Sequence, residues 1–134
     1  MTRFNHFEFY NPNPKENITE DCVIRALTKV LNKTWFEVYD EACAIGREIC
    51  HMPNNEKTWK EVLKRHGFVR KTIAQVKRGG KALTPEKFCE LHPQGVYILR
   101  MAHHLQACVD GRYYDLTPGL GAGKVYSYYE KVNN

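Results

Sequence analysis

Residues 103–116, HHLQACVDGRYYDL, predict a β-hairpin. Strand-forming residues flank the pair Asp110–Gly111, and this dipeptide favours a two-residue type I′ turn because both of its positions take positive φ. Such a turn sets the register, which pairs Val109 with Arg112, Ala107 with Tyr114, and Gln106 with Asp115. His104 then lies one diagonal step from Asp115, about 7–8 Å between backbones, which an imidazole side chain can span.

The two faces of this hairpin differ in character. One face carries apolar side chains and is expected to pack into the core: Leu105, Ala107, Val109, Tyr114 and Leu116, with His103 on the same side. The other face is mixed and polar: His104, Gln106, Cys108, Tyr113 and Asp115. A carboxylate on one ring nitrogen of His104 would set its tautomer and leave the other nitrogen as a base. The alternatives are a surface histidine and an aspartate that only ends a strand.

Helical patterns come first along the rest of the chain, and strand patterns follow. Apolar spacing and capping residues predict helices in four segments: 20–32, 34–46, 56–66 and 83–93. The expected boundary residues are Thr19 or Asp21, Asn32, Thr34, Gly67 and Thr84. After residue 94, the runs VYILRM, LQACV, RYYDL and VYSYY alternate as strands do. This order predicts one α+β domain, residues 1–134, with an antiparallel sheet, an extended surface segment at 1–19 and a loop at 77–83.

Composition excludes several classes of protein. The 134 residues are 43% hydrophobic and 26% charged, which is typical of a globular domain. The apolar runs are too short for a transmembrane helix, and the opening MTRFNHFEFYNPNP lacks the apolar run of a secretory signal. The five cysteines form no Cys-x-x-Cys pair, and their odd number argues against a disulfide framework. We therefore expect a cytoplasmic protein with reduced thiols and no membrane partner.

Cys22 is the strongest candidate for a nucleophile. It falls in the first turn of the helix expected at 20–32, where free main-chain N–H groups and the helix dipole stabilise a thiolate. An early cysteine on a helix, a later histidine on a strand and an acid across the hairpin describe a catalytic triad of Cys22, His104 and Asp115. The alternative is a cysteine that packs in the core face of an amphipathic helix.

Four segments resemble small phage and bacterial proteins of the papain-like cysteine peptidase superfamily: DCVIRAL, TWFEVYDEA, HPQGVYILRMAHHLQACVDGRYYDL and VYSYYE. The resemblance implies a papain-like fold, in which a helix bearing Cys22 packs on a sheet bearing His104 while Asp115 orients the imidazole. It also implies thiol chemistry on an acyl group, with a peptide or protein amide as substrate and no cofactor. For a phage-encoded protein, the compartment would be the cytoplasm of the bacterial host.

The oxyanion donor departs from the pattern of that superfamily. Papain-like enzymes usually carry a Gln six residues before the nucleophile, and this chain has Glu16 there. Asn17 and Gln106 are the two side chains that we expect could replace it. The main-chain N–H of Cys22 supplies one further donor. A rival reading is therefore a papain-like binding protein without turnover.

A basic segment is the second candidate site. Residues 57–87 hold ten Lys or Arg against Glu61 and Glu86, a net charge of +8, so the rest of the chain sums to −3. Its predicted patch consists of Lys60, Lys64, Arg65, Arg70, Lys71, Lys77 and Arg78. Such a patch suits an acidic protein or a nucleic acid, as in a phage–host conflict. The alternative is an ordinary solvated helix face with a loop.

Three further patterns carry no functional prediction. The run 119–124, GLGAGK, lacks the first glycine of a phosphate-binding loop because residue 118 is Pro, and we expect a flexible loop near the cleft. Cys108 lies about 13 Å along its strand from His104 and is expected to be a packing residue. No metal is predicted, because the spacing is too loose for a zinc site among Cys43, Cys50, His51 and Cys89.

Overall fold

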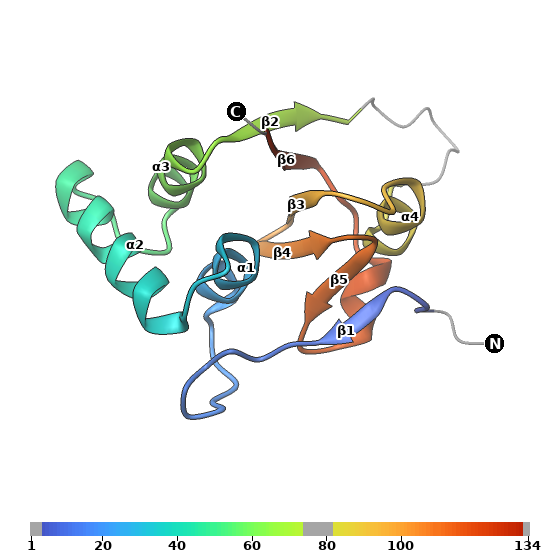
Figure 1. The fold of residues 1–134 in the computed structure, drawn as a ribbon, viewed down its shortest axis with the longest axis horizontal. Helices are drawn as coiled ribbons and strands as arrows, with labels where there is room; N and C mark the ends of the chain where they lie inside the picture. Colours follow the sequence, from blue (N-terminus) through green and yellow to red (C-terminus); the bar gives the residue numbers. More distant parts are fainter. Residues whose placement is uncertain (1–3, 74–81, 133–134) are drawn as a thin grey trace.

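The structure, a computed structural model, describes residues 4–73 and 82–132, with three of its four helices before β2 and four of its six strands after α4 (Figure 1). Its elements in chain order are β1 (Phe7–Phe9), α1 (Cys22–Leu31), α2 (Trp35–Ile49), α3 (Glu56–Arg65), β2 (Phe68–Thr72), α4 (Pro85–Leu91), β3 (Val96–Met101), β4 (His104–Val109), β5 (Arg112–Asp115), the 3₁₀ turn η1 (Pro118–Ala122) and β6 (Ser127–Lys131). The predicted α+β class is confirmed. Most of the predicted loop at 77–83 lies outside the described residues.

The strands form a six-stranded mixed sheet in the order β1-β5-β4-β3-β6-β2. The predicted hairpin is β4 and β5, and its turn residues Asp110 and Gly111 have φ of 49° and 78°. The predicted register is confirmed for Ala107 with Tyr114 and for Val109 with Arg112. The C-terminal strands pair antiparallel as predicted, and the N-terminal segment, predicted to run extended over the surface, adds β1 parallel to β5 at one edge.

The helix boundaries follow local capping chemistry. The helix α1 starts after Asp21 and ends at Asn32, which takes the left-handed conformation with φ of 54°. Thr34 and Glu37 form a capping box that starts α2. This helix runs three residues past its predicted end at Gly46. A Cβ on Gly46 would lie 2.5 Å from the carbonyl oxygen of His51, so this glycine permits a close approach of the chain and does not end the helix.

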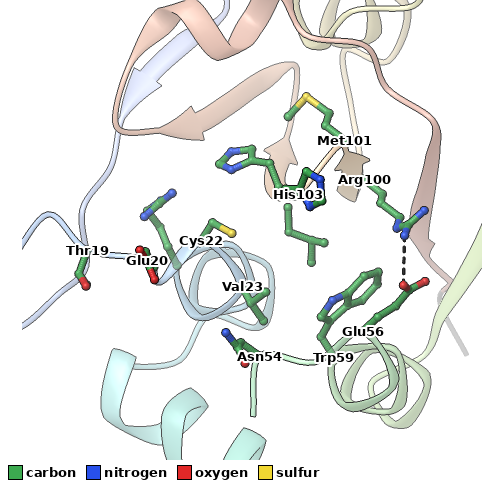
Figure 2. Close-up of a pocket in the computed structure, with 13 residues that line it drawn as sticks. Thr19, Glu20, Cys22, Val23, Asn54, Glu56, Trp59, Arg100, Met101 and His103 are labelled. Carbon is green, nitrogen blue, oxygen red and sulfur yellow. Dashed lines mark hydrogen bonds and ion pairs between the residues drawn. The ribbon is translucent and has the colours of Figure 1, made fainter. Parts of the chain in front are cut away.

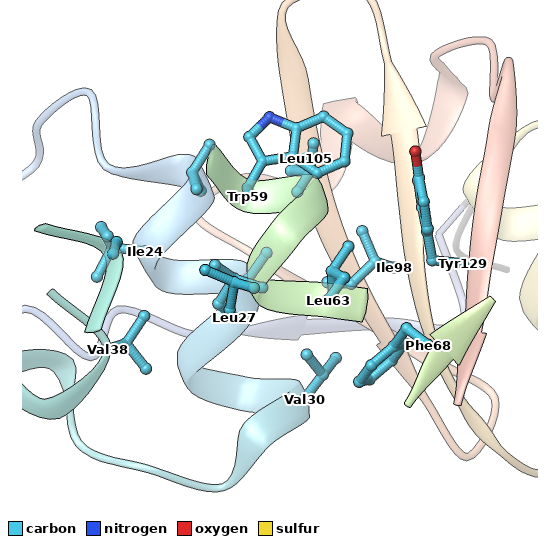
Figure 3. Packing of buried hydrophobic residues seen from close by; sticks show 14 of the residues in the cluster. Ile24, Leu27, Val30, Val38, Trp59, Leu63, Phe68, Ile98, Leu105 and Tyr129 are labelled. Carbon is cyan, nitrogen blue, oxygen red and sulfur yellow. The ribbon is translucent and has the colours of Figure 1, made fainter. Parts of the chain in front are cut away.

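One face of the sheet is covered by α1 and α3, with α2 packed outside them (Figure 1). Figure 3 shows the centre of this core, where Leu27 of α1 and Leu63 of α3 meet Ile98 of β3. All three side chains are fully buried. The apolar half of the hairpin contributes Leu105 and Ala107 to the same core, as predicted. This packing fixes the position of α1 on β4.

The opposite face of the sheet is a second core. Phe88 and Cys89 of α4 pack there against Cys108 of β4 and Tyr113 of β5. The packing role predicted for Cys108 is confirmed, whereas the prediction that Tyr113 lies on a mixed, polar face is wrong: both side chains are fully buried because α4 covers them. His103 is also misplaced by the prediction: it is exposed, in the turn between β3 and β4 with φ of 53°.

The glycine-rich run is not a flexible loop. Residues 118–122 form η1, which packs beside α4, β1 and β5. The hydroxyl of Tyr113 donates to the carbonyl oxygen of Pro118 at 3.0 Å. A Cβ on Gly121 would collide with the same hydroxyl, so the glycine is needed for close packing. Among the described helices, none is long and apolar enough to cross a membrane.

Candidate active site

The structure brings together the three residues predicted as a triad. Cys22 is the first residue of α1, His104 the first of β4 and Asp115 the last of β5. The Nε2 atom of His104 lies 2.6 Å from Oδ2 of Asp115. The His104 side chain also lies close enough to the thiol of Cys22 for the thiol to raise the pKa of the imidazole and for the imidazole to lower the pKa of the thiol. Since Asp115 occupies Nε2, the Nδ1 atom is left for the thiol.

The surroundings of Cys22 favour the thiolate. Burial would raise the pKa of the thiol, but hydrogen bonds from the His104 side chain and the main-chain N–H of Leu105 lower the pKa below its usual value. The positive charges of His104 and Arg25 act in the same direction. The nucleophile therefore ionises more readily than an ordinary cysteine.

The pKa values of His104 and Asp115 shift in the directions that favour the charged form of each group. Burial would lower the pKa of His104, but its bonds to Asp115 and Cys22 raise the pKa from 6.5 to about 9. Burial would raise the pKa of Asp115, but the hydrogen bond and charge of His104 hold it below its usual value. These shifts favour the thiolate of Cys22, the imidazolium of His104 and the carboxylate of Asp115 over their uncharged forms.

Asp115 is the most heavily bonded of these three groups, at 1% exposure. Its Oδ2 accepts from Nε2 of His104 and, at 2.7 Å, from Nε2 of Gln106. Its Oδ1 accepts from the main-chain N–H of Leu116 at 2.8 Å and from Nη2 of Arg25 at 3.2 Å. Two donors on each oxygen leave the carboxylate little freedom to rotate.

Neither of the predicted oxyanion side chains lies in the pocket. Gln106 is buried behind Asp115, where its amide donates to the carboxylate and its Oε1 has no partner among the described residues. Asn17 belongs to a loop in which its N–H donates to the side chain of Asn13 and its carbonyl accepts from Asn11. The alternation of the strand places Gln106 on the His104 face of β4. It does not say whether the Gln106 side chain reaches the pocket or is buried against Asp115.

The N-terminus of α1 is a main-chain source of oxyanion donors. The first N–H groups of a helix have no acceptor within it, and an N-cap side chain normally supplies one. Here the N-cap is Asp21, whose side chain makes no capping hydrogen bond. Its carboxylate instead accepts from Arg25 at 2.8 Å and from Nε1 of Trp35 at 2.9 Å. The main-chain N–H groups beside Cys22 are thus left without this side-chain cap.

The pocket beside Cys22 has a volume of about 560 Å³. Figure 2 shows Cys22 and Val23 on the α1 side and Trp59 on the opposite side. An ion pair between Glu56 and Arg100, 3.1 Å apart, marks the far end. Because Val23 and Trp59 are buried and the ion pair is half-exposed, the pocket has an apolar floor and a charged rim.

Arg25 and Trp35 are members of the site that sequence reasoning missed. Arg25 is the one charged residue in a run of α1 that is otherwise buried and uncharged, residues 23–28. It stands four residues after Asp21, the spacing at which side chains meet on a helix. A buried arginine in an apolar face is the sequence signal that could have indicated a buried partner.

The predicted basic patch is only partly free of acidic partners. Lys60 pairs with Glu56 at 2.6 Å, and Arg65 pairs with Glu48 and Glu61. The exposed basic residues that remain of the prediction are Lys64, Arg70 and Lys71. Lys77 and Arg78 lie outside the described residues. The patch is therefore weaker than the count of charges along the sequence indicates.

Comparison of the chain with protein-family models, curated proteins and solved structures found no match. The resemblance to papain-like peptidases thus gains no support from relatives. The geometry of Cys22, His104 and Asp115 and the pocket beside them are the features that indicate a function.

Proposed function

We propose that the protein is a cysteine-dependent hydrolase that acts on an acyl group, with the amide of a peptide or protein as its substrate. The observation that carries the proposal is the chain from Cys22 through His104 to Asp115, with the thiol pKa lowered and the imidazole pKa raised. Perturbed groups of this kind, gathered at a pocket, are typical of catalytic sites. Cys22 and His104 both line the pocket, so a substrate can reach them.

Each group has a defined part in the proposed reaction. The thiolate of Cys22 attacks the carbonyl carbon and forms a C–S bond, while the carbonyl electrons move onto oxygen. Main-chain N–H groups at the start of α1 stabilise this oxyanion. When the intermediate collapses, the C–N bond breaks and His104 gives its proton to the leaving amine. Water, deprotonated by His104, then hydrolyses the thioester and releases the acid and the free thiolate.

The thiolate–imidazolium pair is tested by the pH dependence of alkylation with iodoacetamide. At pH 6 an ordinary thiol with a pKa of about 8.5 is only roughly 0.3% ionised. We expect Cys22 to react at pH 6 at least tenfold faster than Cys50, an exposed cysteine mapped in the same sample by mass spectrometry. The His104→Ala variant is expected to lose this advantage. Reaction of Cys22 only above about pH 8.5 would contradict the pair.

Acyl transfer is tested with p-nitrophenyl acetate, whose ester carbonyl accepts a thiolate. The expected result is a burst of p-nitrophenolate of about one equivalent per chain, with the acetyl group mapped to Cys22. The Cys22→Ala variant is expected to show no burst, and the Cys50→Ser variant to keep it. A burst that survives in Cys22→Ala would refute the assignment of the nucleophile.

The second candidate is a binding protein without turnover that captures an acidic partner or a nucleic acid. It is favoured by the lack of an oxyanion donor from Gln106 or Asn17. Binding through several phosphates weakens steeply with salt, so affinity for a single-stranded oligonucleotide would fall more than about tenfold between 50 and 200 mM salt. This result, together with no acetyl burst, would favour the second candidate.

A further inference from the structure

We infer that Arg25 is a positioning residue of the catalytic site, which locks the helix that carries the nucleophile onto the carboxylate that orients the base. This inference rests on the proposed thiol chemistry and deepens it. Arg25 lies one turn after Cys22 on α1, at 4% exposure, and lines the same pocket. Its guanidinium bridges two buried carboxylates, those of Asp21 and Asp115.

The bridge joins segments that are far apart in the sequence. Nη1 of Arg25 lies 2.8 Å from Oδ1 of Asp21, four residues earlier on the same helix. Nη2 lies 3.2 Å from Oδ1 of Asp115, 90 residues later at the end of β5. The planar guanidinium presents its donors in a rigid fork, so the two contacts fix both the distance and the orientation between α1 and β5.

The contacts form a ring of five residues in which four successive links join opposite charges. Going round it, the carboxylate of Asp21 binds Arg25, Arg25 binds Asp115, Asp115 binds His104, and His104 binds Cys22. Cys22 follows Asp21 directly in the chain, which closes the ring. Each buried charge thus has an opposite charge as neighbour, which is the condition under which buried ions are tolerated.

The position of Arg25 controls which oxygen of Asp115 faces the base. Arg25 and the main-chain N–H of Leu116 hold Oδ1, so Oδ2 is turned toward His104. A guanidinium keeps its charge throughout the accessible pH range, so it also favours the ionised form of the carboxylate. The same positive charge favours the thiolate of Cys22.

Asp21, the second partner of Arg25, is the N-cap residue of α1 but does not cap the helix with its side chain. The Nε1 atom of Trp35 donates to Oδ2 of Asp21 at 2.9 Å, which leaves Oδ1 for Arg25. Both oxygens of the N-cap carboxylate thus accept from side chains, and α1 begins without a side-chain cap. A helix start that gives up its cap to hold a buried arginine fits a positioning role better than a purely stabilising one.

Three variants test the role by the pH profile of Cys22 alkylation. Arg25→Met removes the charge and both contacts, and is expected to lower the rate at pH 6 at least tenfold and to move the profile to higher pH. Arg25→Lys keeps the charge but reaches only one carboxylate, so its rate should fall between those of Arg25→Met and the native protein. Lys29→Met, the matched control, removes a cation one turn further along α1, whose Nζ lies 4.2 Å from the ring centroid of Tyr114 and which has no ion pair among the described residues.

The outcomes separate this inference from the proposed function. A shifted profile in Arg25→Met, partial recovery in Arg25→Lys and a native profile in Lys29→Met support the positioning role. A folded Arg25→Met variant with lower thermal stability and a native profile overturns it and leaves Arg25 as a structural residue. If Arg25→Met does not fold, a native profile in Arg25→Lys overturns it equally. Slow reaction of native Cys22 at pH 6 refutes the proposed function itself.

Discussion

Cys22 is partly buried and Cys108 is fully buried, yet the pKa values of their thiols shift in opposite directions. The pKa of Cys22 is lowered by hydrogen bonds with His104 and the N–H of Leu105, which together outweigh burial. The pKa of Cys108 is raised by a hydrogen bond with the thiol of Cys89, at 3.1 Å, and by burial. The thiol of Cys22 lies at the start of α1 and faces an ionisable base, whereas the thiol of Cys108 faces a second thiol.

The difference shows that burial does not decide the chemistry of a cysteine in this fold. Both residues lie beside β4 or on it, and each belongs to one of the two cores or packs against it. What separates them is the set of partners, because donors to the thiolate favour ionisation and an apolar setting opposes it. Removing first the thiols and then their partners should therefore separate the two environments.

Replacing each cysteine by alanine should dissociate activity from stability. Cys22→Ala is expected to abolish the p-nitrophenolate burst and to leave the melting temperature nearly unchanged. Cys108→Ala is expected to keep the burst and to lose about 1–2 kcal/mol of stability, because it opens a small cavity in the second core. Stopped-flow absorbance and urea unfolding of both variants measure the two effects. A loss of the burst in Cys108→Ala would mean that the two cores are coupled.

Asp115→Asn should disturb both the site and the fold. The amide no longer stabilises the imidazolium of His104, so Cys22 alkylation at pH 6 is expected to fall by about ten- to a hundredfold. Arg25 loses a charged partner in the interior, which costs about 3–5 kcal/mol when a buried pair is broken. The melting temperature should therefore fall by roughly 10 °C.

The matched control for this variant lies on the same hairpin. Asp110→Asn also removes a carboxylate, but Asn is well suited to the type I′ turn and its amide oxygen can still accept from the N–H of Gly95. We expect a native alkylation profile and a native melting temperature. Equal losses in both variants would show that the hairpin, and not the charge of Asp115, is what matters.

The pH dependence of stability gives a further test of Asp115. Its pKa is lower in the folded protein than in the unfolded chain, where it is about 3.9. The stability that follows is therefore full above about pH 4 and is lost as the pH falls through the folded pKa. The difference in melting temperature between the native protein and Asp115→Asn should shrink from pH 5 to pH 2, as measured by circular dichroism. A constant difference would show that the charge of Asp115 contributes nothing.

The sequence predicts the parts of the site that depend on local rules. The Asp110–Gly111 turn sets the register that brings His104 to Asp115, and the helix start places Cys22 among free N–H groups. The bridge by Arg25 could not be predicted in the same way, because it depends on how α1 packs against β5, a contact across 90 residues. The second core was missed for a similar reason, since period two does not reveal that α4 covers the far face.

Replacing Gln106 is expected to change stability and rate least. The variant distinguishes an amide that only hydrogen-bonds Asp115 from one that stabilises the oxyanion. Gln106→Met keeps the volume and removes one donor to Asp115, which retains three others. The lost bond to a charged group is worth about 1.5–3 kcal/mol, but the buried Oε1 without a partner disappears with it, and that group carries a penalty of about 1–3 kcal/mol. The net change in stability should thus stay within about 1 kcal/mol. An oxyanion donor would instead be worth about 10²–10³ in rate. A burst rate within about threefold of native, as in the exposed control Gln94→Met, would therefore show that Gln106 is not that donor.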